Sequence, residues 1–145
     1  MNAGGNRMFV ALIPARKGSK GLANKNTIKL CGRPCIEYTI EAAIQSKIFD
    51  EVIVSSNDNF ALQIANEYSV STVQRPESIC TDTSSAADVV EHSIDVMSLK
   101  EEAVICYLQP TSPLRNATHI KDAARLYYSV QRPLVSVREA KEIPY

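Results

Sequence analysis

The sequence predicts an α/β fold in which a mostly parallel sheet carries helices on both faces. Short apolar segments rich in β-branched residues alternate with longer segments whose apolar residues recur at helical spacing. This alternation favours parallel strands joined by crossover helices. The chain has 145 residues, the length of one domain with a substantial core, and it shows no repeat, linker or low-complexity segment.

Five segments have the length and composition of strands in such a sheet. The first runs directly into a basic loop, and the fourth is the next clearest. In chain order, the expected strands are residues 8–13, 51–55, 70–73, 103–108 and 133–137.

A helix is expected after each of the first four strands, because apolar residues there lie three and four positions apart. Proline suits the first turn of a helix, and Ser, Thr, Asp and Asn suit the N-cap. The residues expected at the four helix starts are Pro34, Asn57 or Asp58, Thr83 or Ser84, and Asn116 or Thr118.

Composition narrows the function classes. Basic and acidic residues both total 16, so the chain has no global charge that would attract nucleic acid. No apolar run reaches the length of a membrane span, and residues 1–7 lack the apolar core of a signal peptide. We therefore expect a flexible segment 1–7, no membrane partner and a cytoplasmic protein. Its four cysteines are then expected to be reduced, with Cys31 and Cys35 structural rather than metal-binding.

The loop after the first strand gathers cations around two glycines. Glycine lets backbone N–H groups approach a ligand closely, and Arg and Lys complement the charge of a polyphosphate. The spacing of Gly18 and Gly21 matches neither the P-loop nor the dinucleotide-binding pattern, so a solvated basic turn remains the alternative. The cations of this loop are Arg16, Lys17, Lys20 and Lys25.

Three of the expected strands end in polar segments. In a parallel sheet the carboxyl ends of the strands share one edge, which is where such sheets bind ligands. The first strand ends at the basic loop, the second at residues 55–58 and the fourth at residues 109–113. The side chains expected to converge at this edge are Arg16, Lys20, Lys25, Asn57 and Gln109.

Three motifs in one order carry a resemblance to a known family. They are IPARKGSKGL at 13–22 followed by Lys25 and Asn26, RPE at 75–77 with TDTSS at 81–85, and LQPTSPLR at 108–115. Together they resemble the CMP-N-acetylneuraminic acid synthetases, also called acylneuraminate cytidylyltransferases, from Phe9 to Val137. The resemblance implies a Rossmann-like three-layer α/β/α fold of the nucleotide-diphospho-sugar transferase type, here incomplete at its C-terminal side.

The resemblance also implies roles for individual residues, while the catalytic residues remain unknown. Each role has a structural alternative: a surface cation, a helix cap or a polar turn. The implied triphosphate-binding residues are Arg16, Lys20, Lys25 and Asn26; the implied cytidine-binding residues are Arg75, Ser84 and Ala86; and Gln109 is implied to face the acceptor sugar.

The implied reaction transfers a cytidylyl group from CTP to a nonulosonic, sialic-type acid with release of pyrophosphate. The family uses Mg²⁺ held by an Asp-x-Asp arrangement that has no match in this chain. The resemblance therefore implies a CTP-binding domain over residues 8–145 that stops before the acceptor-sugar, metal-binding and dimerisation parts of a homodimeric enzyme, so that this fragment would be poorly active. The open alternatives are another sugar nucleotidyltransferase, of the Kdo or NDP-sugar type, and a non-catalytic nucleotide-binding module. Two features argue against the first alternative: the Lys-Gly-Leu run at 20–22 and the turn at 109–113. The Kdo type also carries an acid near the position of Thr111, which this chain does not.

Overall fold

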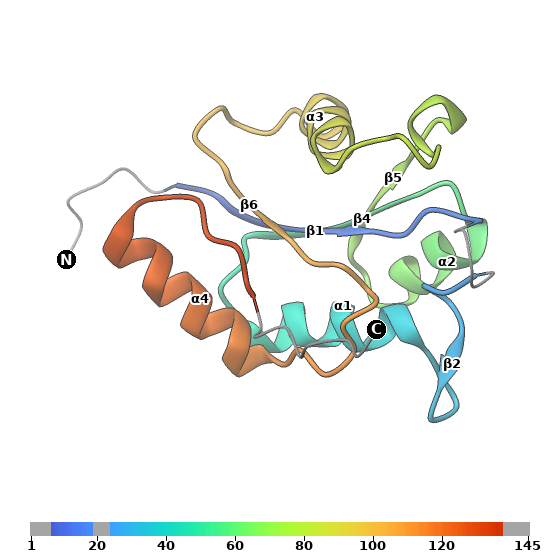
Figure 1. The fold of residues 1–145 in the computed structure, drawn as a ribbon, viewed down its shortest axis with the longest axis horizontal. Helices are drawn as coiled ribbons and strands as arrows, with labels where there is room; N and C mark the ends of the chain where they lie inside the picture. Colours follow the sequence, from blue (N-terminus) through green and yellow to red (C-terminus); the bar gives the residue numbers. More distant parts are fainter. Residues whose placement is uncertain (1–6, 19–23, 138–145) are drawn as a thin grey trace, which may run out of the picture.

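The computed structural model describes residues 7–18 and 24–137, and a parallel sheet of four strands lies at its centre (Figure 1). Its strands stand in the order β5–β4–β1–β6. The strands are β1 (Phe9–Pro14), β4 (Glu51–Ser56), β5 (Ser71–Gln74) and β6 (Val104–Tyr107). Each matches a predicted strand to within one or two residues, so the first four strand predictions are confirmed.

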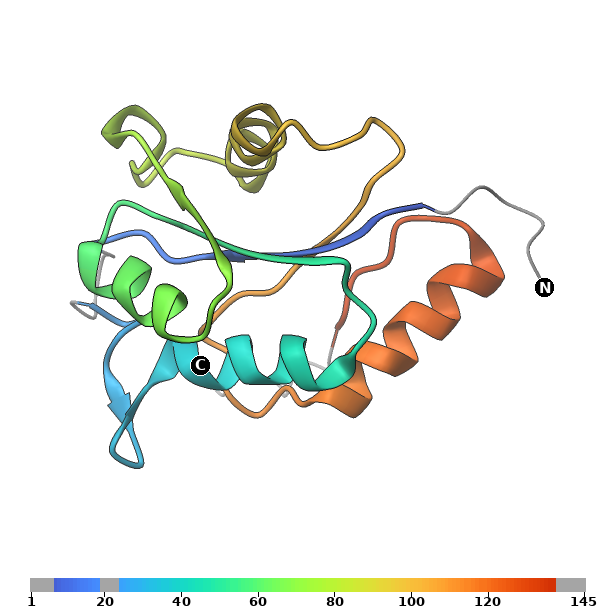
Figure 2. The same ribbon diagram turned by 180° about the vertical axis from the view of Figure 1, so that it is seen from behind.

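Helices cover both faces of the sheet, which confirms the three-layer α/β/α prediction. Helices α1 (Cys35–Ser46), α2 (Asn59–Glu67) and α4 (Ala117–Val130) lie on one face, and α3 (Ala86–Met97) lies on the other (Figures 1 and 2). The chain moves from β1 to β4 and β5, then crosses back to β6 on the far side of β1. Because parallel crossovers are right-handed, reversing the direction of travel places α3 on the opposite face from α1 and α2.

Strand β1 supplies both cores. Ala11 and Ile13 pack against α1 and α2, while Val10 and Leu12 pack toward Val89 of α3. All four strand residues are at most 1% exposed. Successive side chains of a strand point to opposite faces, so a continuous apolar run in the sequence corresponds to a strand covered on both sides.

A short hairpin of β2 (Lys29–Leu30) and β3 (Arg33–Pro34) precedes α1, and the sequence did not predict it. Its two-residue turn holds Cys31 and Gly32, both with positive φ, as a type I′ turn requires. Cysteine is not a usual residue at such a turn, which explains why the pattern gave no signal. Pro34 lies immediately before α1 as its N-cap residue rather than inside the first turn.

Of the other three helix starts, two agree with the predictions and one differs. Asp58 caps α2 by accepting from the N–H of Phe60, and Asn116 caps α4. The prediction of Thr83 or Ser84 for α3 was wrong, because Ser85 is the cap. Its hydroxyl accepts from the N–H of Asp88, whose carboxylate accepts from the N–H of Ser85, forming a capping box.

The fifth strand prediction was also wrong. Residues 133–137 form no strand and are exposed, and in the described part of the chain their backbone has no hydrogen-bonded strand partner. A strand exists only where a neighbour completes its backbone hydrogen bonds, and an apolar pattern does not reveal whether that neighbour is present. Pro133 and Leu134 instead line an apolar groove with β6 and α4.

Candidate nucleotide-binding site

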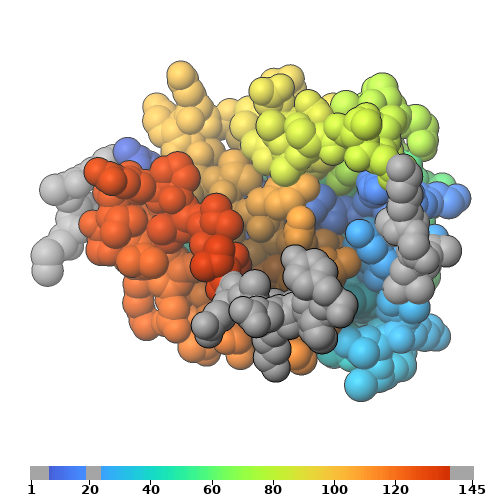
Figure 3. All heavy atoms as spheres, viewed as in Figure 1, coloured from blue at the N-terminus to red at the C-terminus, as the bar shows by residue number. Residues whose placement is uncertain are grey.

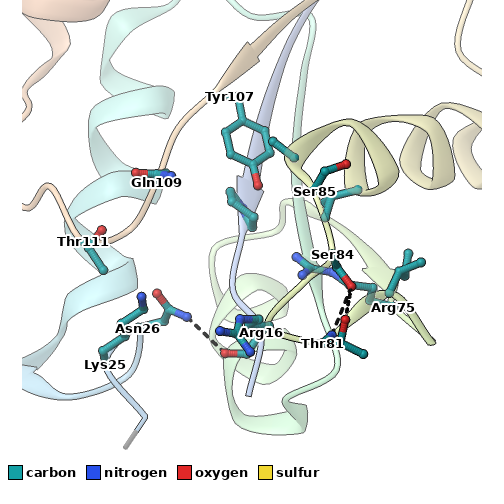
Figure 4. A pocket seen from close by; sticks show the side chains of 14 residues that line it. Arg16, Lys25, Asn26, Arg75, Thr81, Ser84, Ser85, Tyr107, Gln109 and Thr111 are labelled. Carbon is teal, nitrogen blue, oxygen red and sulfur yellow. Dashed lines mark hydrogen bonds between the residues drawn. The ribbon is translucent and has the colours of Figure 1, made fainter. Parts of the chain in front are cut away.

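An open pocket of about 180 Å³ lies at the carboxyl edge of the sheet, where the ends of β1 and β6 meet the start of α3 (Figure 4). Between β1 and β6 the chain reverses its direction across the sheet, which is where ligands bind in open α/β folds. In Figure 3 the blue, yellow-green and orange segments around these elements meet on one face. The pocket is lined by Arg16, Lys25, Asn26, Arg75, Ser84, Ala86 and Gln109, all predicted from the sequence. Lys20 was predicted with them but lies outside the described residues.

The side chains form two walls. The loop wall consists of Arg16, Lys25 and Asn26, which follow β1. The α3 wall consists of Arg75, Ser84 and Ala86, which follow β5 and begin α3. Gln109 lies across the pocket from the α3 wall, at the end of β6 (Figure 4).

Arg16 connects the two walls. Its Nη2 lies 2.8 Å from Oδ1 of Asp82, and its Nη1 donates to the carbonyls of Gly18 at 3.2 Å and Cys80 at 3.4 Å. The guanidinium is therefore held at the pocket by the segment that leads into α3. Because Asp82 neutralises part of its charge, an incoming anion competes with that carboxylate for Arg16.

Asn26 is fixed in the loop wall and Lys25 is not. Asn26 is 7% exposed, and its side-chain Nδ2 donates to the backbone carbonyl of Arg16 at 3.1 Å. The backbone carbonyl of Asn26 accepts from the N–H of Ile36. Lys25 is half-buried, and its ammonium has no carboxylate partner among the described residues. The loop wall therefore presents one cation that carries its full charge to a ligand.

Asn57 was expected to converge with these residues, but it does not line the pocket. Its Oδ1 accepts from the N–H of Lys17 at 2.7 Å, and its Nδ2 donates to Glu77 at 3.0 Å. Asn57 thus anchors the loop after β1 from outside the pocket, because its side-chain oxygen and nitrogen are both hydrogen-bonded to neighbouring segments.

Arg75 places a buried charge at the α3 wall. It is 4% exposed, and it donates from Nε to the hydroxyl of Ser55 at 3.2 Å and from Nη2 to the Ser55 carbonyl at 2.8 Å. Burial lowers the pKa of the guanidinium, which remains charged at neutral pH because that pKa starts so high. No carboxylate pairs with Arg75 in the described ranges. An acceptor from a ligand would therefore complete this site.

A short polar turn forms the rest of the α3 wall. The Ser84 hydroxyl accepts from the N–H of Thr81 at 3.1 Å and shares a 2.8 Å hydrogen bond with the Thr81 hydroxyl. Ala86 begins α3 directly after the cap residue Ser85. The side chains of Ser84 and Ala86 are small, which leaves room for a ligand beside the start of α3.

Gln109 is held by its backbone, and its side chain has no hydrogen-bond partner among the described residues. Both terminal nitrogens of Arg115 donate to the Gln109 carbonyl at 3.2 Å, and the thiol of Cys35 donates to the carbonyl of Pro110 at 3.2 Å. Burial lowers the pKa of Arg115. These contacts fix the turn after β6 and leave the Gln109 amide for a ligand. They also give the buried Cys35 the structural role predicted for it.

Sequence reasoning gave no binding role to several residues that line the pocket, among them Thr81, Tyr107 and Thr111. Tyr107 lies within an apolar strand and reads as core. A signal was nonetheless present, because Tyr107 and Gln109 are two positions apart and residues at that spacing share a face of a strand.

No metal site is visible in the part of the chain that the structure describes, since no three His, Cys, Asp or Glu side chains gather there. The predicted Mg²⁺ requirement therefore stays a prediction. None of the described helices has the length and apolar character needed to cross a membrane.

Comparison with known proteins identifies relatives of this chain. The chain is 42% identical over 124 residues to the N-acylneuraminate cytidylyltransferase of Escherichia coli, covering 86% of this chain and 29% of that protein. It is 37% identical over 135 residues to the CMP-N,N'-diacetyllegionaminic acid synthase of Legionella pneumophila, covering 89% and 57%. The chain thus spans between about three tenths and just under three fifths of the length of these relatives.

The fold is also found among solved structures. A CMP:2-keto-3-deoxy-manno-octonic acid synthetase complexed with CTP superposes with a TM-score of 0.70 at 23% identity, over 86% of this chain and 48% of that one. This likeness shows the fold. A family profile described as cytidylyltransferase matches residues 10–138, which include both walls and Gln109. The chain belongs to the cytidylyltransferase family.

Proposed function

We propose that this protein transfers the cytidylyl group of CTP to a nonulosonic acid, giving a CMP-sugar and pyrophosphate. The observation that most directly supports this proposal is that the loop wall, the α3 wall and Gln109 line one pocket at the carboxyl edge of the sheet. The loop wall then binds the triphosphate, the α3 wall binds cytidine and Gln109 faces the acceptor. The names of the E. coli and L. pneumophila relatives support an acceptor of the nonulosonic class.

The reaction is a displacement at phosphorus. The anomeric 2-hydroxyl of the acceptor attacks the α-phosphorus of CTP, a new O–P bond forms, and the bond to the β-phosphate oxygen breaks. The acceptor hydroxyl loses its proton, and pyrophosphate leaves with the electron pair of the broken bond. Such chemistry depends on positioning and on neutralising charge that moves to the leaving group. Lys25, Arg16 and Lys20 are the cations proposed for that neutralisation.

We propose that turnover also requires Mg²⁺, which supplies further neutralisation of the phosphates when bound. Its carboxylate ligands are proposed to come from outside the described residues. Asp82 is the carboxylate paired with Arg16, and an attacking or leaving anion would share that cation with it.

Homodimerisation and a cytoplasmic location complete the proposal. The apolar groove between β6, α4 and residues 133–136 supports association, since it exposes apolar surface that a partner subunit would cover. The four cysteines are free, which suits a reducing compartment where CTP is available.

The test measures pyrophosphate release by the complete gene product with CTP, Mg²⁺ and, in turn, sialic, legionaminic, pseudaminic and Kdo acids. We expect release with at least one of the first three acids and a loss of release when ATP, GTP or UTP replaces CTP. Release with Kdo alone would contradict the acceptor class. Binding of CTP without release under any condition would instead indicate a non-catalytic nucleotide-binding module.

A further inference from the structure

Tyr107 contributes a hydroxyl to the pocket that no predicted role uses. It lies at the end of β6, where it pairs with Leu12 of β1, and its ring packs on the core beneath α3. The side chain is half-buried, and its hydroxyl forms no hydrogen bond to any described residue. Because the hydroxyl borders the open pocket, it is available to hydrogen-bond a ligand group there.

The position of the hydroxyl indicates which part of a nucleotide it meets. Figure 4 shows it pointing into the pocket, between Gln109 after β6 and Ser85 at the start of α3. The charge of Arg75 acts on the phenol, which places Tyr107 near the α3 wall. Because burial raises the pKa of Tyr107, the group is a neutral hydroxyl at neutral pH, able both to donate and to accept.

We propose that the Tyr107 hydroxyl hydrogen-bonds the nucleoside part of the bound cytidine nucleotide. This inference rests on the proposed function, because it takes cytidine to be the group at the α3 wall. Cytosine and ribose both carry donors and acceptors that match a neutral phenol. A phosphate would be bound instead by the cations of the loop wall. The hydroxyl therefore contributes equally to binding of CMP and CTP.

The test measures the dissociation constants of CMP and CTP by calorimetry for the wild-type chain and for Tyr107→Phe. This substitution removes the hydroxyl, keeps the ring that packs beneath α3, and breaks no hydrogen bond between described residues. We expect both nucleotides to bind about 3- to 10-fold more weakly, as for the loss of one neutral hydrogen bond. Tyr128→Phe is the matched control: Tyr128 is 61% exposed and lies far along α4, so its loss of a hydroxyl should change neither constant.

Unchanged binding of both nucleotides by Tyr107→Phe would overturn the inference while leaving the proposed function intact. A loss that is larger for CTP than for CMP would also overturn it, since the hydroxyl would then face the phosphates. Failure of the wild-type chain to bind either cytidine nucleotide would contradict the proposed function itself, and the inference with it. Thermal unfolding midpoints of the three proteins should agree, which separates a lost contact from a loosened fold.

Discussion

The two walls of the pocket hold positive charge in different ways. At the α3 wall, the guanidinium of Arg75 is 4% exposed and donates twice to Ser55 of the neighbouring strand. At the loop wall, Lys25 is half-buried and has no acidic partner among the described residues. The first charge is part of the folded sheet edge, whereas the second is available to a ligand. Stability and binding should therefore be linked at one wall and separable at the other.

Arg75→Ala should produce the largest effect, because it acts on both properties. It removes both hydrogen bonds from the guanidinium to Ser55, whose carbonyl keeps the N–H of Ala15, and it opens a cavity beside the strand end. We expect these changes to lower the free energy of unfolding by about 2–4 kcal/mol. It should also weaken CMP binding. Chemical denaturation and calorimetry measure the two effects. Arg125→Ala is the control, because the side chain of Arg125 is 78% exposed, and it should change neither. A stable variant with unaltered CMP binding would contradict the proposal that Arg75 contributes to cytidine binding at the α3 wall.

Lys25→Ala should affect binding alone. We expect CTP binding to weaken by about 1.5–3 kcal/mol, as for the loss of a charge-assisted hydrogen bond, with unfolding nearly unchanged. The loss should be smaller for CMP, which carries fewer phosphates. Lys47→Ala removes the same charge from the exposed C-cap of α1, so it is the matched control. Equal small losses for the two variants would show that the loop wall is no specific phosphate site.

Gln109→Ala should act on the acceptor rather than on the nucleotide. Its amide has no described partner, while its carbonyl is held by Arg115, so the turn should persist without the side chain. In the complete gene product we expect the KM for the acceptor acid to rise about fivefold, which corresponds to a loss of roughly 1 kcal/mol of binding free energy. The KM for CTP should stay constant. Steady-state kinetics with each substrate varied in turn decides this. A rise in the KM for CTP instead would place Gln109 against the nucleotide.

Asp88→Asn should give the smallest effect, and one that depends on pH. Hydrogen bonds from the Ser85 backbone and side chain hold the pKa of Asp88 below its ordinary value of 3.8. A carboxylate with a lowered pKa in the fold stabilises above its unfolded pKa, and that contribution is lost as the pH falls through the folded value. The variant should therefore be less stable than wild type near pH 7, and in denaturation experiments the difference should shrink as the pH falls below 3.8. A pH-independent difference would contradict the capping-box interaction.

The sheet and the site were predictable where the determinants are local. Strands β1, β4 and β6 are short apolar runs, and a strand buried on both faces has that pattern wherever it occurs. The parallel order then placed the loop wall and Gln109 at one edge. The Ser85 cap was also within reach, because Asp88 stands three residues later, as a capping box requires. The conformation of residues 133–137 could not be predicted in this way. A strand forms only beside a neighbouring strand, and the local sequence pattern does not show whether that neighbour is present.

Long-range pairings account for the remaining differences. The ion pair of Arg16 with Asp82 joins positions 66 residues apart, and the burial of Arg75 depends on Ser55 from another strand. Neither is visible in a local pattern. The predicted role of Lys20 lies outside the described residues and stays a prediction. The predicted flexibility of residues 1–7 also stays a prediction, since only Arg7 of that segment is described. Arg7, at the end of that segment, donates to Tyr127 and Gln131 of the α4 region.

The central claim is that the α3 wall recognises cytosine while the loop wall binds phosphate regardless of the base. The most direct measurement is a calorimetric comparison of CTP, UTP, ATP and GTP binding to this chain. UTP is the decisive competitor, because it shares the ribose, the triphosphate and the pyrimidine ring of CTP and differs at one exocyclic group and the ring nitrogen beside it. We predict that CTP binds most tightly, and that Arg75→Ala reduces its advantage over UTP whereas Lys25→Ala weakens both equally. Equal affinity for all four nucleotides would show that the pocket reads phosphate only, and would contradict the assignment of cytidine to the α3 wall.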